Sequence, residues 1–218
     1  MSAFPGSPRL IKGGIVLIDP EIGTVLRVIS LQYNPETLNR TLQIRGAGEP
    51  GDRTEALRLT GPPIESIKVD VEFDATDQLE FPDQNPTAAQ LGLHAQLAAL
   101  ETIVYPDSAQ LQSTDGLARA GTLEIIPAQA PLTLFVWSKN RVLPVRFTEF
   151  SITEESFDPL LNPTRAKVSL GMRVLSNNDL PSSHKGNSLF VAYHQQKENL
   201  AKKHQPGVIN TLGVTRIL

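Results

Sequence analysis

The sequence predicts a mainly β fold: an antiparallel sheet, closed into a barrel or packed as a two-sheet sandwich, with one long flanking helix and a C-terminal helical extension. Three observations predict it. Seven stretches alternate apolar with polar side chains or form β-branched runs, as strands do. Only two stretches have the spacing of helices, and they fall after the fourth and the last strand. The 17 prolines and 15 glycines are spread along the chain, which suits short elements joined by turns.

The strands are clearest where the alternation is strict. In residues 67–73, Ile, Val, Val and Phe alternate with Lys, Asp and Glu, so one face is apolar and the other is charged. Residues 166–174 repeat this pattern, and Lys139-Asn140 and Asn162-Pro163 indicate turns. The predicted strands are residues 14–18, 25–32, 41–44, 64–73, 132–137, 142–154 and 164–175.

The long flanking helix is predicted over about residues 86–104. Asn85 is an N-cap residue, Pro86 suits the first helical position, and Pro106 stops the helix. Apolar side chains recur at steps of four, three and four, which places them on one face. This stripe consists of Leu93, Leu97, Leu100 and Val104.

A second helix is predicted over about residues 188–203 and is closed by Pro206-Gly207. Lys202 and Lys203 lie at its C-terminal end, where the helix dipole favours positive charge. Its apolar residues gather near its start, so we expect it to dock on a partner or a neighbouring face. The expected organisation is a β domain over residues 1–176 and a C-terminal extension over residues 177–218.

Two stretches, residues 46–60 and 107–122, are polar and rich in turn-forming residues. Both are predicted to be exposed and irregular. Irregular loops of this length in a compact domain are usually functional or disordered.

Composition excludes several classes. The chain has 218 residues, with 20 Lys+Arg against 23 Asp+Glu, a net charge of −3, and no cysteine. The absence of cysteine rules out disulfide scaffolds and thiolate-based sites. The near-neutral charge argues against a general nucleic-acid surface. The longest apolar run, residues 15–18, is far shorter than a membrane span, and no secretory signal is recognised at the N-terminus. We therefore expect a soluble cytosolic protein.

Catalytic and cofactor motifs are weak. Residues 46–51 fit G-x-G-x-x-G, but Glu49 and Pro50 oppose phosphate binding and no apolar helix follows, so a surface loop is the better interpretation. His94, His184 and two further histidines fall in separate segments without metal-binding spacing. We predict no catalytic, cofactor-binding or metal-binding residues.

One segment concentrates carboxylates: Glu149, Glu154, Glu155 and Asp158. Paired acids can perform general acid–base catalysis, so an enzyme is one functional hypothesis. It is the least favoured one, because no coherent catalytic motif accompanies these acids. A charge cluster beside a turn is more often a solvated face.

Five landmarks in order carry a resemblance to a known family. They are Tyr33-Asn34-Pro35, V-E-F-D-A-T at residues 71–76, a helix ending in Tyr-Pro at residues 97–106, P-L-T-L-F-V-W at residues 131–137, and N-P-T-R-A-K-V-S-L at residues 162–170. With this series the chain resembles the tube-like baseplate proteins of phage-like contractile injection systems. The likeness is to the N-terminal tube-like domain of the LysM-type baseplate adaptor, without a recognisable LysM module after Leu175.

The resemblance implies a tail-tube-like two-sheet β-barrel whose copies join sheets edge to edge into rings, with a hexamer expected. It implies a structural role and no enzymatic activity: a baseplate adaptor ring between the spike hub and the inner tube. Its partners would be copies of itself, the inner-tube protein, the spike or hub protein, and sheath or other baseplate proteins, with no nucleic acid. Assembly would occur in the bacterial cytoplasm, and the product would be an injection particle.

Under this interpretation we expect the aromatic-Asn-Pro corner, the 46–60 loop, the single tryptophan and the terminal helix to make interfaces. The corresponding residues are Tyr33, Asn34, Pro35, Arg45, Glu49, Arg53, Arg58, Trp137, Phe190, Tyr193, Lys202 and Lys203.

Two alternatives stay open at this point. The chain would be the inner-tube subunit if its copies stack on one another, whereas an adaptor has different partners above and below. A monomer with a deep apolar pocket would instead indicate a small-ligand-binding β-barrel.

Overall fold

A computed structural model of the chain describes residues 10–46, 58–119, 130–205, 207 and 211. Its centre is one seven-stranded antiparallel sheet with the strand order β2-β1-β5-β6-β7-β4-β3. The mainly β class and all seven predicted strands are confirmed. The strands are β1 (Gly14–Ile18), β2 (Val25–Ser30), β3 (Asn39–Gln43), β4 (Ile64–Asp74), β5 (Leu132–Ser138), β6 (Arg141–Phe157) and β7 (Pro163–Val174).

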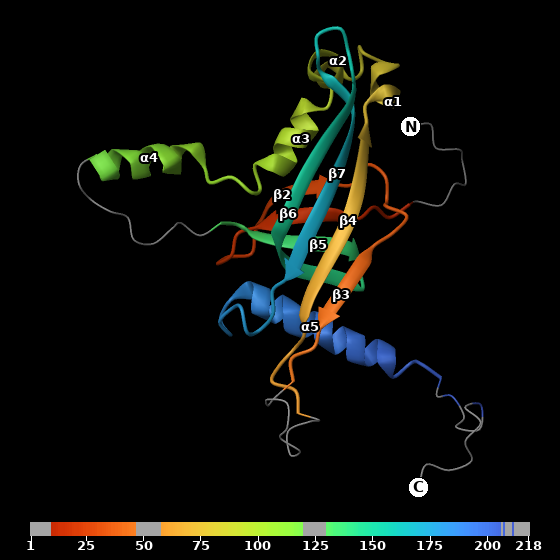
Figure 1. The fold of residues 1–218 in the computed structure, drawn as a ribbon, viewed down its shortest axis with the longest axis vertical. Coiled ribbons are helices and arrows are strands. Elements are labelled where there is room, and N and C mark those ends of the chain that lie inside the picture. The colour runs from red at the N-terminus through yellow and green to blue at the C-terminus, as the bar shows by residue number, and fades with distance from the viewer. Residues whose placement is uncertain (1–9, 47–57, 120–129, 206, 208–210, 212–218) are drawn as a thin grey trace.

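Strand β6 divides this sheet into two layers. Its residues 141–145 pair with β5, whereas its residues 145–157 pair with β7, and the register shifts between Phe147 and Glu149. We call β2, β1, β5 and the start of β6 the rear layer. The front layer is β3, β4, β7 and residues 146–157 of β6. Figure 1 shows the strands of the front layer crossing those of the rear layer at a steep angle.

The hydrophobic core fills the space between the two layers. Along β4 every second side chain, from Glu65 to Phe73, points inward and is buried, while the intervening side chains are exposed. This is the period-two pattern expected of a strand with one buried face and one solvent-exposed face. Rear strands, front strands and two helices all contribute to the same cluster, which includes Ile15, Leu31, Phe135, Leu143, Ile67, Val71, Val168, Met172, Leu97, Leu100 and Tyr193.

Helices lie at the two ends of the long strands (Figure 1). The apical end consists of α1 (Thr76–Leu79), α2 (Pro86–Leu91) and the β6–β7 turn at residues 158–162, with α3 (His94–Glu101) beside them. The basal end consists of α5 (Lys185–Ala201), the β5–β6 turn and the residues flanking the β3–β4 connection. The core is therefore enclosed by two layers of sheet and by helices at each end.

The predicted flanking helix is present but divided. Gly92 separates α2 from α3 with φ +53° and ψ −129°, a conformation that glycine adopts readily. A Cβ at this position would lie 2.4 Å from the carbonyl oxygen of Pro163, so the glycine also allows the chain to approach β7 closely. The backbone N–H of Leu93 then donates to that same carbonyl at 2.8 Å.

The terminal helix α5 begins three residues before its predicted start. The ring Nδ1 of His184 accepts a hydrogen bond from the Gly186 N–H at 3.0 Å and caps the helix. The helix then docks on its own chain: Tyr193 belongs to the core and is 5% exposed, and Phe190 packs against that core.

The prediction of an irregular stretch over residues 107–122 was wrong for residues 108–119, and residues 120–122 lie outside the described residues. Helix α4 (Ser108–Arg119) lies there and projects away from the sheet in Figure 1. Asp107 provides the start signal that the sequence interpretation passed over, since its Oδ1 accepts from the Ala109 N–H at 3.1 Å. The polar composition of this stretch therefore correctly predicted that it is exposed, but it did not indicate that it is helical.

We predict that Gly92→Ala destabilises the fold by roughly 1–3 kcal/mol, because alanine would be strained at this φ and its Cβ would meet a backbone oxygen. Urea unfolding of the two proteins measures the difference.

The matched control is Gly116→Ala in α4, where a Cβ meets nothing within 4 Å. This change should leave stability unchanged or raise it by up to about 1 kcal/mol. Equal stabilities of the two variants would contradict the role assigned to Gly92.

Candidate assembly surfaces

The outer face of the front layer is mainly polar. On β4, Lys68 and Asp70 point outward; the Lys68 Nζ lies 2.6 Å from Glu149 Oε2 of β6, and Asp70 Oδ1 accepts from the Ser169 hydroxyl of β7 at 2.5 Å. Further along, Lys167 lies 3.2 Å from Glu155. These exposed pairs contribute little stability, because solvent screens them. Their effect is to give a broad, hydrated face without an apolar patch.

The front layer ends in an unpaired strand on each side, within the part of the chain that the structure describes. Strand β3 pairs only with β4, and residues 146–157 of β6 pair only with β7. Three successive antiparallel pairings separate β3 from β6, so these two edges run in opposite directions. Unpaired edges expose rows of N–H and C=O groups that can pair with another chain.

The rear layer also has a free edge, at β2. Val25, Leu26 and Val28 there are more than half exposed. An exposed edge strand with apolar side chains is a typical site of protein association.

The aromatic-Asn-Pro corner joins segments that are distant in sequence. The Asn34 Oδ1 accepts from the Gly13 N–H at 2.9 Å, and its Nδ2 donates to the Ile11 carbonyl at 2.8 Å. Next to it, the Gln32 side chain accepts from the Asp74 N–H at 2.9 Å and donates to the Asp74 carbonyl at 2.6 Å. Asn34 therefore positions the start of β1, whereas Tyr33 is 44% exposed and is available for contacts.

A cluster of three charges, which the sequence interpretation missed, holds β3, β4 and α5 together. The carboxylate of Glu65 is buried, with the residue 3% exposed. Its Oε1 accepts from Arg40 Nε at 2.8 Å and Nη2 at 2.6 Å, and its Oε2 accepts from Lys197 Nζ at 3.1 Å. Arg40 also donates to the Tyr193 hydroxyl at 3.2 Å, and the Lys197 ammonium lies 4.2 Å from the centre of the Tyr193 ring. The cations lie on segments far apart in the sequence, so no local motif indicated the cluster.

This cluster forms one wall of a groove at the basal end, which we call the basal groove. It is open to solvent and has a volume of about 590 Å³. Trp137 also lines this groove and stacks on Phe135, with ring centres 5.8 Å apart. Of the predicted interface residues, the fold thus brings Trp137 and Tyr193 to one groove. Its lining includes Arg40, Leu42, Trp137, Arg141, Lys197 and Leu200.

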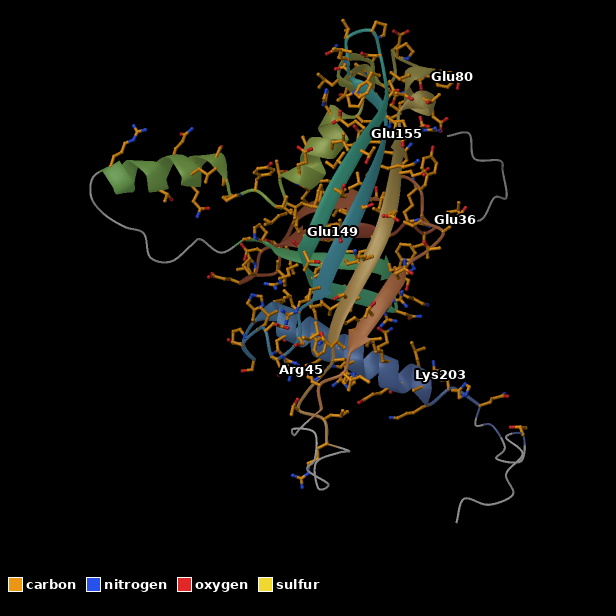
Figure 2. The ribbon with its side chains drawn as sticks, in the orientation of Figure 1. Glu36, Arg45, Glu80, Glu149, Glu155 and Lys203 are labelled. Carbon is orange, nitrogen blue, oxygen red and sulfur yellow. The ribbon has the colours of Figure 1, made fainter. Side chains whose placement is uncertain are left out.

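The remaining predicted interface residues divide into three groups. Arg45, Arg58, Lys202 and Lys203 are exposed at the basal end, and Figure 2 shows Arg45 and Lys203 there. Pro35 and Phe190 are half-buried. Glu49 and Arg53 lie outside the described residues.

The β6–β7 turn at the apical end is a second feature that sequence reasoning did not select. Asp158 Oδ1 accepts from the backbone N–H groups of Leu160 and Asn162, each at 2.8 Å. Hydrogen bonds from the Asn162 side chain and backbone hold the pKa of the Asp158 carboxyl below its usual range. The turn presents Leu160 and Leu161 to solvent, 77% and 75% exposed, and Leu161 has a left-handed φ of +64°. The signal available in the sequence was the pair of leucines between proline and asparagine.

The carboxylates that suggested acid–base chemistry do not gather into one site. Glu149 and Glu155 are six residues apart on one strand, hence about 20 Å apart, and each is paired with a lysine. Within the described ranges no three His, Asp or Glu side chains are grouped as a metal site would require. No helix in these ranges is long and apolar enough to cross a membrane.

Comparisons with known proteins do not assign the chain to a family. No protein-family model matches the chain, and no curated protein matches it either. Among the solved structures, it is similar to one described as the tail of an empty GTA particle with C6 symmetry. The TM-score is 0.29 and the identity 11%, over 79% of this chain and 95% of that chain. At that TM-score we base no inference on the likeness.

We predict that Glu65→Ala lowers the free energy of unfolding by about 1–3 kcal/mol. It leaves Arg40 and Lys197 without their shared carboxylate, and their partial exposure reduces the penalty relative to a fully buried pair. Urea titration of the variant gives the value.

Glu149→Ala is the control, because it also removes a lysine partner but at an exposed position. We expect a change within about 0.5 kcal/mol. If Glu65→Ala were equally mild, the cluster would not hold α5 to the sheet.

Proposed function

We propose that the chain is a structural, ring-forming subunit of a phage-tail-like particle. In the ring, β3 of one copy pairs with the free edge of β6 in the next, and the polar outer faces line a channel. The observation that carries this proposal is the front layer itself, which combines a hydrated face with two free edges of opposite direction.

The directions of the edges favour closure. Because β3 and β6 are antiparallel to each other, rotating one copy onto the next gives antiparallel pairing at every junction. A contact between two different edges closes into a ring when the rotation between copies divides a full turn. Six copies of a four-stranded layer would give a 24-stranded barrel, and barrels of that size enclose an open lumen.

Within the particle, we propose the position that the ordered sequence landmarks indicate: an adaptor ring between the spike hub and the inner tube. The landmarks from Tyr33 to residue 170 fall on the connection that follows β2 and on β4, α3, β5 and β7, so they include strands of both layers. The inner-tube subunit is the alternative, and it differs in having copies of itself above and below.

The ligand-binding β-barrel receives less support. Such a barrel encloses a cavity within its sheet, whereas buried side chains from both layers fill the space here. Two hollows along the described residues, of about 400 and 590 Å³, both open at the surface.

Engineered cysteines test the proposed junction, and the natural chain contains none. Thr41 on β3 and Ser151 on β6 share the outer face. In one copy they are separated by three strand spacings and by four residues along the strands, roughly 20 Å in all, which is too far for a disulfide. We predict that Thr41→Cys combined with Ser151→Cys gives oxidised oligomers that end in one closed species on a non-reducing gel. Because the register between copies is not fixed, Glu149→Cys and Thr153→Cys are tested as alternative partners.

The control pairs Thr41→Cys with Lys167→Cys, which lies on β7 inside the sheet. This pair should not crosslink. A protein that assembles without crosslinks at any of the three β6 positions, or stays monomeric, would contradict the proposed ring.

A further inference from the structure

The two ends of the front layer carry opposite charge. Between Ala75 and Leu100 the chain contains Asp77, Glu80 and Asp83 and no lysine or arginine. Between Lys185 and Lys203 it contains four lysines and one glutamate. Figure 2 shows Glu80 and Glu155 toward the apical end, and Arg45 and Lys203 at the basal end.

Each end also offers apolar surface. The apical turn presents Leu160 and Leu161, held in place by the hydrogen bonds of Asp158. A leucine with a left-handed φ is strained, and such strain persists at sites of function more often than elsewhere. This turn is rigid, acidic and carries two exposed leucines. Such a turn is suited to docking in a groove of another molecule, because little conformational entropy is lost when it binds.

The basal groove has the complementary properties. Trp137 and Leu200 provide apolar surface, and Arg40, Arg141 and Lys197 provide positive charge. Glu65 offsets the charge of Arg40 and Lys197 only in part. The Arg141 guanidinium has no ion-pair or hydrogen-bond partner among the described residues. The basal groove has a volume of about 590 Å³, which is within the range of sites that bind small ligands.

We infer that the β6–β7 turn of one copy docks in the basal groove of a second copy, so that copies associate head to tail along the strand direction. Leu160 and Leu161 meet the Trp137 side of the groove, and the acidic apical residues face Arg141 and Lys139. This contact goes beyond the lateral pairing of the proposed function and is independent of it. It does bear on the position in the particle, because end-to-end docking of identical copies is the arrangement of the inner-tube alternative and not that of the adaptor.

Leu161→Gly separates docking from folding. Glycine suits the left-handed φ, so the variant should be as stable as the natural protein or more stable. It loses a buried leucine at the contact, so end-to-end association should weaken by about ten- to a hundredfold. Sedimentation velocity across a protein concentration series measures association, and urea unfolding measures stability. Unchanged association would overturn the inference.

A charge exchange tests the polarity of the contact. One variant carries Glu80→Lys and Glu154→Lys at the apical end, and the other carries Lys139→Glu and Arg141→Glu at the basal end. Each alone should fail to associate end to end, since like charges then meet. An equal mixture should associate again, because each apical end then finds a basal end of opposite sign. Association of the natural protein should also fall as salt is raised from about 0.05 to 0.5 M.

The outcomes separate this inference from the proposed ring. Closed rings that crosslink through β3 and β6 but never stack, or a mixture that fails to restore stacking, overturn the inference and leave the ring intact. Salt-sensitive head-to-tail association without lateral crosslinks supports the inference and contradicts the ring.

Discussion

The double pairing of β6 is the constraint on which the structure depends. One strand of 17 residues belongs to both layers, pairing with β5 at its start and with β7 along the rest. The register shift after Phe147 lets it turn from one layer into the other. Without that turn the sheet would not fold over itself, and the inner faces of β1, β4 and β7 would have no partner to pack against.

The same arrangement produces the unpaired edges. Because β5 uses only the first five residues of β6, the longer second half keeps one side free. The strand order leaves β3 and β2 at the outer limits of the sheet. A continuous sheet that is folded instead of closed must end somewhere. Here its ends are placed where copies of the chain can extend it.

The ends of the strands differ in chemistry as well as in structure. At the basal end, the buried carboxylate of Glu65 secures both the edge strand β3 and helix α5, which leaves a cationic groove beside Trp137. At the apical end, Asp158 shapes a short turn with exposed leucines. The surfaces proposed for lateral and for axial contacts are therefore separate, and each can be altered without changing the other.

The sequence by itself determined the seven strands, the region of the flanking helices and the terminal helix, because local alternation and capping encode them. It also indicated Tyr33-Asn34-Pro35 as a corner. Tertiary structure decided the rest: the break at Gly92 requires the nearby Pro163 carbonyl, and the Glu65 cluster joins residues 132 positions apart. Helix α5 packs on its own core although its apolar stripe is incomplete, since Tyr193 is buried in that core and Phe190 packs against it. Edges and grooves arise from strand order, and strand order depends on long-range pairing that local sequence does not specify.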